Sequence, residues 1–185
     1  MKDKIATKRL TLRQLELSDV NALSRLGGEF DIARMTGSFP HPFPPLSAEF
    51  RLMYLKQKWR QGLAHPYAIT LDGGELIGMA DLFRTTSDDD FEIGYWVGKP
   101  FWGQGYATEA ARAVLEEARL SLGISLIKAG AFTDNPASLR VLEKLGFVMT
   151  GVAESYFSMA RMQNTPSQSF ELDLDKFGLA DLKTA

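Results

Sequence analysis

The stretch that decides the fold is residues 94–110, Gly-Tyr-Trp-Val-Gly-Lys-Pro-Phe-Trp-Gly-Gln-Gly-Tyr-Ala-Thr-Glu-Ala. The apolar, aromatic residues 91–97 predict a strand, and the alanine-rich residues 104–122 predict a long helix. The first N–H groups of a helix lack partners within the helix and lie at the positive end of its dipole. Because Gly103 and Gly105 carry no Cβ, a phosphate can approach this backbone closely. The stretch therefore predicts a strand, an anion-binding loop and a helix.

Other glycine motifs fit this loop less well. Gly-x-Gly after a strand also opens the dinucleotide fingerprint Gly-x-Gly-x-x-Gly, but Thr108 stands at the third glycine. A dinucleotide-dependent oxidoreductase would carry its motif in an N-terminal βαβ unit, with an acidic residue about 20 residues later. No segment matches the phosphate-binding loop Gly-x4-Gly-Lys-Ser/Thr. A loop that only turns the chain stays an alternative.

The composition is that of an ordinary globular chain. Its 185 residues, 45% hydrophobic and 24% charged, predict a single domain over 1–185. A net charge of −2 provides no basic field for nucleic acid. The absence of cysteine excludes disulfides, a thiol nucleophile and thiolate metal sites, and with only two histidines no metal site is expected. No apolar run resembles a signal peptide or a membrane span, so we expect a cytoplasmic protein with no membrane partner.

The rest of the chain alternates between strand and helix patterns. Further strands are predicted over residues 9–15, 67–71, 76–83, 125–132, 147–153 and 169–174. Further helices are predicted over residues 18–26, 47–61 and 136–145. Turn and loop patterns cover residues 37–46, 72–74, 85–90 and 154–168. This order predicts an α/β fold around a mixed sheet of about seven strands with about four helices.

Two segments occur together in the order that is typical of one family. The first is residues 94–96 with 101–110, and the second is Thr133-Asp134-Asn135-Pro136-Ala137-Ser138 followed by residues 141–147. In these segments the chain resembles the GNAT superfamily of acyl-CoA-dependent N-acetyltransferases. Within it, the chain is similar to the ribosomal-protein-alanine (Rim-type) branch, which residues 7–13 also resemble. The resemblance implies the GNAT fold, with a mostly antiparallel central sheet, and acetyl-CoA as the acyl donor.

The resemblance also implies which residues bind acetyl-CoA. Backbone amides of the loop and first helical turn should hold the pyrophosphate: Gly103, Gln104, Gly105, Tyr106 and Ala107. Main-chain groups of Tyr95, Trp96 and Val97 should pair with the amide-bearing pantetheine arm. Asn135 should hydrogen-bond the pantetheine, and it also fits the N-cap of the helix that follows. Trp96 and Trp102 are expected to line the acyl pocket, with core packing as the alternative.

Two positions depart from the superfamily pattern. Pro100 stands three residues before the first motif glycine, where Gln or Arg is common, and Leu142 stands where many members carry a tyrosine general acid. The donor of a proton to the leaving thiolate is therefore open. Ser138 is expected near the thioester sulfur as a hydrogen-bond donor, with a polar position in the first helical turn as the alternative. Tyr156 is a fallback acid.

Acetyl transfer to an amine also needs a base that makes the amine neutral. Glu92 is the leading candidate, because it lies three residues before Tyr95 among aromatic residues that can raise its pKa. It would act directly or through a water, and a solvent-facing carboxylate is the alternative. Asp81 is a weaker candidate, and Glu109 better fits the positive end of a helix. His41 and His65 read as structural residues.

The predicted activity is direct acetyl transfer without an acyl-enzyme, since no serine stands in a nucleophile-elbow pattern. The acceptor is a primary amine. The Rim-type branch implies a protein N-terminal α-amine, although relatives acetylate aminoglycosides and polyamines. The acidic run Asp88-Asp89-Asp90 reads as a solvated loop. An acyl-CoA-binding module without useful catalysis is the alternative from another class, and the chain is expected to be a monomer or a homodimer.

Overall fold

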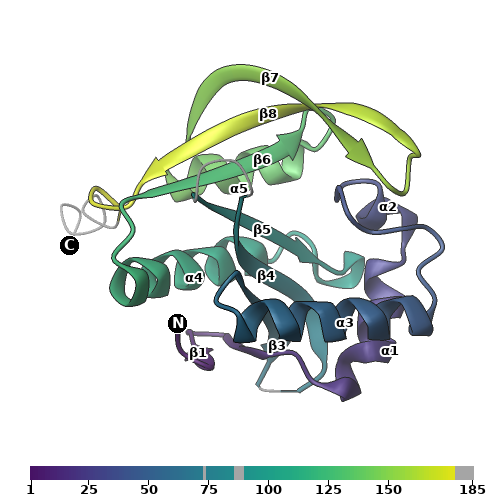
Figure 1. The fold of residues 1–185 in the computed structure, drawn as a ribbon. Coiled ribbons are helices and arrows are strands. Elements are labelled where there is room, and N and C mark those ends of the chain that lie inside the picture. The colour runs from purple at the N-terminus through teal and green to yellow at the C-terminus, as the bar shows by residue number, and fades with distance from the viewer. Residues whose placement is uncertain (73, 86–89, 178–185) are drawn as a thin grey trace.

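The computed structural model describes residues 1–72, 74–85 and 90–177, with only the main chain of residues 152 and 153. The described residues form an eight-stranded sheet in the order β1-β2-β3-β4-β5-β6-β8-β7 (Figure 1). The strands are β1 (Lys4–Ala6), β2 (Leu10–Gln14), β3 (Ala64–Leu71), β4 (Leu76–Arg84), β5 (Phe91–Val97), β6 (Leu126–Phe132), β7 (Val148–Ser158) and β8 (Gln163–Asp173). All neighbours are antiparallel except β5 and β6, which are parallel. The predicted mixed, mostly antiparallel sheet is confirmed, with one strand more than expected.

Five α-helices flank this sheet in the described part of the chain. They are α1 (Val20–Gly27), α2 (Phe30–Ala33), α3 (Pro45–Arg60), α4 (Tyr106–Leu122) and α5 (Pro136–Leu145). Short 3-10 turns, η1 (Leu17–Asp19) and η2 (Lys99–Phe101), precede α1 and α4. Among the described helices, none is both long and apolar enough to cross a bilayer.

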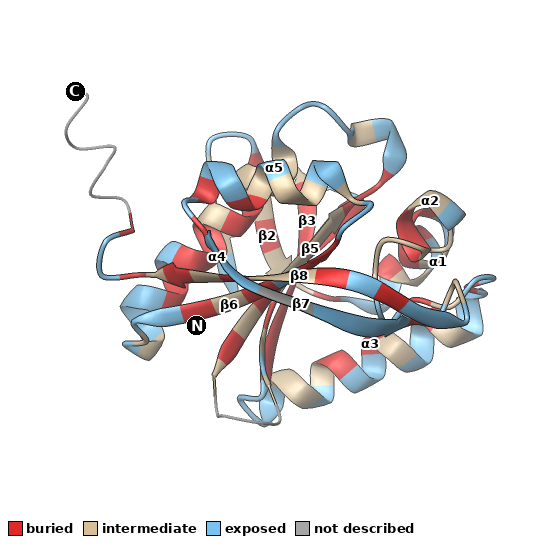
Figure 2. Ribbon diagram, turned by 90° about the horizontal axis from the view of Figure 1, so that it is seen from above, coloured by how far each residue is buried: buried red, intermediate tan, exposed pale blue. Residues whose placement is uncertain are grey.

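The helices cover both faces of the sheet (Figure 2). Helices α4 and α5 pack on one face, and the core there joins them to side chains such as Ala80, Ile93 and Ile127. Helices α1 and α3 pack on the other face, over Ala68 and Met79. Because strand side chains alternate between the two faces, Tyr95 points toward α4 and α5, whereas Trp96 lies on the face of α1 and α3.

Strands β5 and β6 separate almost as soon as they pair. Only two positions of the pair are in register, Phe91 opposite Ile127 and Glu92 opposite Lys128. On its other side, β5 pairs with β4 along its whole length. Residues 93–97 therefore form a strand segment with a neighbour on one side only, which we call the open edge of β5.

The two predicted C-terminal strands, 147–153 and 169–174, are present, but they are longer than predicted. Residues 154–168 were expected to be a loop, but they lie in the long β7–β8 hairpin. The described side chains of β7 are nearly all exposed, and the buried positions of β8 near the turn are the polar Thr165 and Ser167, so the sequence there lacks the apolar alternation that marks a half-buried strand. The three-residue β1 and four-residue α2 are too short to give a pattern, and both were missed. Parts of two predicted loops, residues 73 and 86–89, lie outside the described residues.

The turn of the hairpin, residues 159–162, is held in place by Arg161. Its guanidinium donates to the Arg34 carbonyl at 2.8 Å, next to α2, and to both carboxylate oxygens of Asp134 at 2.9 and 3.0 Å. The Met159 N–H also donates to the carbonyl of Gly37. The end of the hairpin consequently lies over α2 (Figure 1), and it ties α2 to the loop that leads into α5.

Candidate active site

The glycine loop before α4 has the backbone that its sequence predicts. Gly103 and Gly105 have φ values of 76° and 79°, in the left-handed region that other residues rarely adopt. Gly105 is the N-cap of α4 and supplies no side-chain cap. The N–H groups of Tyr106 and Ala107 thus stand at the helix N-terminus without an intrahelical acceptor, which suits an anion.

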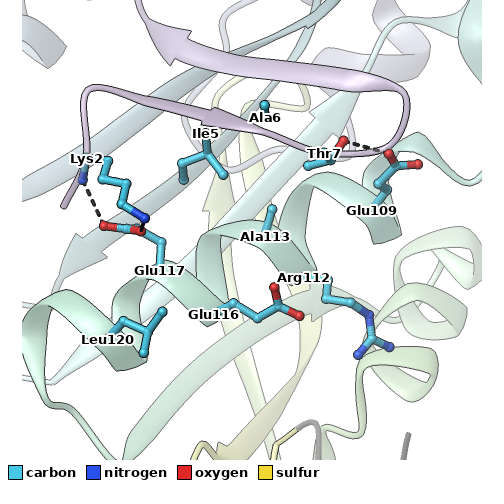
Figure 3. A pocket seen from close by; sticks show the side chains of 10 residues that line it. All are labelled: Lys2, Ile5, Ala6, Thr7, Glu109, Arg112, Ala113, Glu116, Glu117 and Leu120. Carbon is cyan, nitrogen blue, oxygen red and sulfur yellow. Dashed lines mark hydrogen bonds and ion pairs between the residues drawn. The ribbon is translucent and has the colours of Figure 1, made fainter.

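The loop is held in place by Arg9, which the sequence reading did not single out. Its guanidinium donates to the Gln104 carbonyl at 2.8 Å and to Glu109 at 2.6 Å, and it lies 4.7 Å from the centre of the Tyr106 ring. Thr7 also donates to Glu109 (Figure 3). Burial alone would raise the pKa of Glu109, but the hydrogen bonds from Thr7 and Arg9 lower it. Glu109 is therefore an ionised anchor for the N-terminal strands, as its structural interpretation predicted.

The open edge of β5 continues directly into this loop. The Gly98 N–H donates to the Ile77 carbonyl of β4 at 2.8 Å. Because ladder positions alternate, the main-chain groups of Tyr95 and Val97 face away from β4, whereas those of Trp96 face it. The Trp102 indole N–H donates to the Val97 carbonyl at 2.6 Å. The main chain of Tyr95 and the Val97 N–H accordingly point to the open edge, whereas the expectation that the Trp96 main chain pairs with a ligand there was wrong, because its groups pair with β4.

The N-terminus of α5 lies opposite, and Asn135 and Ser138 meet there. The Asn135 side chain accepts a hydrogen bond from the Ser138 N–H at 3.1 Å, which confirms the predicted N-cap. The Tyr95 hydroxyl lies 3.1 Å from the Ser138 hydroxyl and 3.2 Å from its carbonyl. Burial raises the pKa of Tyr95 to about 12, so its hydroxyl is a neutral hydrogen-bond donor at physiological pH. Leu142, at the family's tyrosine position, is buried in the core.

Glu92 lies where β5 and β6 are still paired. Its pKa is raised by burial and then by Glu154, against the effects of Lys128 and a hydrogen bond from the Gly130 main chain. Glu92, Lys128, Gly130, Glu154 and Tyr156 belong to the lining of a hollow of about 340 Å³. The raised pKa fits the predicted base, although Glu92 lies three residues before Tyr95 and on the opposite face of β5. Tyr156 donates to Glu154 and is exposed on β7, away from any predicted motif.

Asp81 of β4 is influenced electrostatically by Arg51 of α3. Burial raises the pKa of Asp81 to about 7, against the opposing effect of the Arg51 cation. Phe39, in the proline-rich loop, packs against Trp96 with ring centres 5.5 Å apart. This contact places the loop beside β5.

The histidines have no place in this arrangement. His65 is 8% exposed and packs edge-on against Trp59, and burial lowers its pKa to about 4. His41 contacts the Gly28 carbonyl and the Phe30 ring at the surface. Among the described residues, no three His, Cys, Asp or Glu side chains are grouped so that they could hold a metal ion.

Comparisons with known proteins agree with this geometry. The family model described as an acetyltransferase (GNAT) domain matches residues 9–148. An N-acetyltransferase called p20 from Bacillus licheniformis is 28% identical over 153 residues, covering 81% of this chain and 85% of p20. The N-acetyltransferase YoaA of Bacillus subtilis strain 168 is 30% identical over 158 residues, covering 82% of this chain and 86% of YoaA.

A solved structure shares the fold at low sequence identity. RimL, a ribosomal L7/L12 α-N-protein acetyltransferase in complex with coenzyme A, superimposes with a TM-score of 0.78 and 20% identity. The match covers 93% of this chain and 98% of RimL. At this identity the likeness concerns the fold.

The split sheet, the glycine loop and these relatives define the chain as an N-acetyltransferase. It belongs to the GNAT acetyltransferase family, whose members use acetyl-CoA as the acyl donor.

Proposed function

We propose that this enzyme transfers the acetyl group of acetyl-CoA directly to the α-amine of a protein N-terminus, as a single-domain, cytoplasmic member of the Rim-type branch. The proposal draws on residues 7–13, which resemble that branch, and on the fold shared with RimL. The domain would comprise residues 1–185 and work as a monomer or a homodimer.

The observation that carries the proposal is the open edge of β5 between two helix N-termini. Tyr95 offers strand-like main-chain groups to the pantetheine amides, and Asn135 would contribute its amide from the facing α5. At the end of the strand, the amides from Gly103 to Ala107 would bind the pyrophosphate. Trp102, whose indole reaches the open edge, would line the acyl pocket with Trp96.

In the proposed chemistry, Glu92 takes the proton of the acceptor amine through a water. Its raised pKa makes it a suitable base near neutral pH. The neutral nitrogen attacks the thioester carbon, and the C–S bond breaks as the C–N bond forms. Ser138, supported by Tyr95, donates a hydrogen bond to the departing thiolate. No residue becomes acylated.

The first experiment is calorimetric titration of the pure protein with acetyl-CoA, CoA and NAD, beside Gly105→Glu. A carboxylate at this position should repel the pyrophosphate and abolish binding of acetyl-CoA and CoA. Gly123→Glu is the matched control, because Gly123 caps the other end of α4 with a similar φ of 63° and open space around it. Equal binding by wild type and Gly105→Glu would refute the phosphate site, and NAD binding would favour the oxidoreductase.

A small cationic amine is the second candidate acceptor. The hollow beside Glu92 also carries Glu154 and Glu171, whereas Lys128 is paired with Asp90 at 2.7 Å. An acetylation assay with an alanine-starting peptide, spermidine and an aminoglycoside separates the two candidates. A higher kcat/KM for the peptide supports the N-terminal α-amine, and a higher value for spermidine or the aminoglycoside supports the second candidate. Acetyl-CoA binding without transfer to any amine would point to a binding module.

A further inference from the structure

Asp81 is a partly exposed residue whose carboxylate has one oxygen that the fold buries without a donor. It lies in β4 directly opposite Gly94 of β5. Its neighbours Ala80 and Leu82 face α4, so its own side chain points to the face of α1 and α3. Among the described residues, no group donates a hydrogen bond to Asp81 Oδ1, although this atom is fully buried. A buried acceptor without a donor is costly, and such an atom calls for a functional explanation.

The cation that acts electrostatically on the Asp81 carboxylate is Arg51 of α3. Its terminal nitrogens donate to the carbonyl and the hydroxyl of Ser38 at 3.4 and 3.0 Å, and its guanidinium lies over the Phe39 ring at 4.5 Å. Arg51 Nε is buried and also has no acceptor within the described chain. Arg51 lowers the pKa of Asp81 through space, yet no contact within 4 Å is found between their charged groups in the described residues.

This arrangement differs from a structural ion pair. A buried ion pair is stabilising only when its charges meet in good geometry and their remaining hydrogen bonds are made. Here the two side chains stay apart, and each keeps an unsatisfied polar atom. The carboxylate is thus free to receive a hydrogen-bonding cation that the protein itself does not supply.

Its place in the sheet puts Asp81 beside the reacting groups. Adjacent strands are about 5 Å apart, so only the backbone of β5 separates Asp81 from the open edge. Gly94, directly opposite, has no side chain of its own, and the ring of Phe83 from β4 lies over it. Trp96, next on the same face of β5, packs with Phe39 to form an aromatic wall. A cation bound to Asp81 would therefore lie next to the strand segment proposed to hold pantetheine.

We propose that Asp81 binds the ammonium group of the acceptor before transfer, and that Arg51 is a positioning residue that favours the ionised carboxylate. The inference rests on the proposed acetyl transfer. The bound ammonium gives one proton to Glu92 through water, and its nitrogen then attacks the thioester carbon. The C–N bond forms, the C–S bond breaks, and a second nitrogen proton passes to the thiolate, so that the products are an amide and CoA thiol.

The surroundings of Asp81 make its titration interpretable. Helix α3 contributes Arg51, and Tyr54 on the same helix acts on Arg51 in turn. On the neighbouring strands, β3 places Pro66 opposite Asp81 and β5 places Gly94 there. Glu92 shares this face of β5 but is turned toward Gly130 of β6. Arg51 is the charged group identified as acting directly on Asp81.

The test is steady-state kinetics with the best amine of the panel, varying the amine at saturating acetyl-CoA. Asp81→Asn should raise the KM for the amine about 10- to 100-fold, the range for a lost hydrogen bond to a charged group, with kcat within a few fold. Glu92→Gln should instead lower kcat. Asp31→Asn is the matched control, since it removes the same charge from an exposed pair with Lys99, and the KM for the amine should stay unchanged.

The pH dependence of the KM for the amine distinguishes a binding role of Asp81 from a loss of folded structure. In the wild type, the KM for a protonated amine should fall as the pH rises through about 7, where Asp81 ionises. Arg51→Gln should move this midpoint to higher pH, Asp81→Glu should retain it, and Asp81→Asn should abolish it. The wild-type profile serves as the test even if Asp81→Asn does not fold.

Two results would overturn the inference: an amine KM in wild type that does not change between pH 6 and 8, or an Asp81→Asn enzyme with unchanged KM and a reduced kcat. Calorimetry separates this outcome from failure of the proposed function. If acetyl-CoA does not bind to the wild type, the proposed function fails, and the inference about Asp81 falls with it. If acetyl-CoA binds and transfer occurs without a contribution from Asp81 to amine binding, only the inference fails.

Discussion

At the scale of single residues, the contact between Tyr95 and Ser138 joins the two sequence motifs. Tyr95 comes from β5 and Ser138 from the first turn of α5, 43 positions later in the chain. Their hydroxyls meet because the Asn135 cap fixes the start of α5. The motif spacing predicts that both segments reach one site, but the side-chain contact depends on how α5 is placed relative to β5, which no residue pattern reports.

The two hydroxyls should act as one unit in catalysis. Tyr95→Phe and Ser138→Ala should each lower kcat about tenfold, because each removes one hydrogen bond that orients the donor to the thiolate. The double variant should be scarcely slower than either single variant. Single-turnover acetylation assays measure the three rates, and calorimetry should find acetyl-CoA affinity nearly unchanged. Fully multiplicative losses would contradict the shared role.

At the scale of elements, the β7–β8 hairpin depends on a few long-range contacts. Strand β8 pairs with β6 over residues 167–173, but toward the turn the two hairpin strands pair only with one another, and the turn is held by Arg161 against α2 and Asp134. Such a strand pair is marginal on its own and needs packing elsewhere. The polar residues near the turn explain why sequence reasoning took residues 154–168 for a loop, whereas β2 to β6, which hold most of the buried strand residues, could be predicted nearly to their ends.

Arg161→Gln should loosen this hairpin without unfolding the protein. We expect a loss of about 1 kcal/mol in the free energy of unfolding. The loss is no larger because Asp134 is 47% exposed, and solvent screens its interaction with Arg161. Hydrogen exchange should accelerate in the strand ends next to the turn. Arg25→Gln is the control, since its pair with Glu75 is exposed on both sides and should contribute within about 0.5 kcal/mol. Equal effects of both variants would contradict a special role for Arg161.

The same anchor should weaken in acid. The pKa of Asp134 is lowered, first by its hydrogen bond with Arg161. A lowered carboxyl pKa contributes stability above the ordinary value of an aspartate, and this contribution disappears as the pH falls through the lowered pKa. The difference in unfolding free energy between wild type and Arg161→Gln should therefore be constant from neutral pH to about pH 5 and shrink below pH 4.

At the scale of the whole molecule, composition and motif order predict the fold class well. They are less informative about interactions between residues that are distant in the sequence. Arg51 with Asp81, Arg9 with Gln104 and Arg161 with Asp134 are each far apart in sequence. No local period or spacing links such pairs, because their geometry follows from strand order and helix placement. The glycine loop and the N-cap, by contrast, are local features, and sequence reasoning finds them.

Global stability should fall in mild acid because of His65. Burial lowers its folded pKa to about 4, so the unfolded chain binds a proton at higher pH than the native protein does. Stability is then lost as the pH falls from about 6.5 to 4, by an amount on the order of 3 kcal/mol, and levels off below. Urea unfolding at several pH values in this range should show that the free energy of unfolding of His65→Phe depends less steeply on pH than that of the wild type. An identical slope in both proteins would rule out His65 as the cause.

The brief pairing of β5 with β6 has a consequence for the lifetime of the protein. Within the sheet, two residue pairs between β5 and β6 join the first five strands to the last three. A ligand that pairs with the open edge of β5 would therefore act as a removable ninth strand. A ligand at 100 times its Kd adds about 2.7 kcal/mol of stability. Proteases would then digest this enzyme fastest in cells short of acetyl-CoA, and the supply of metabolic fuel would set the abundance of the catalyst as well as its rate.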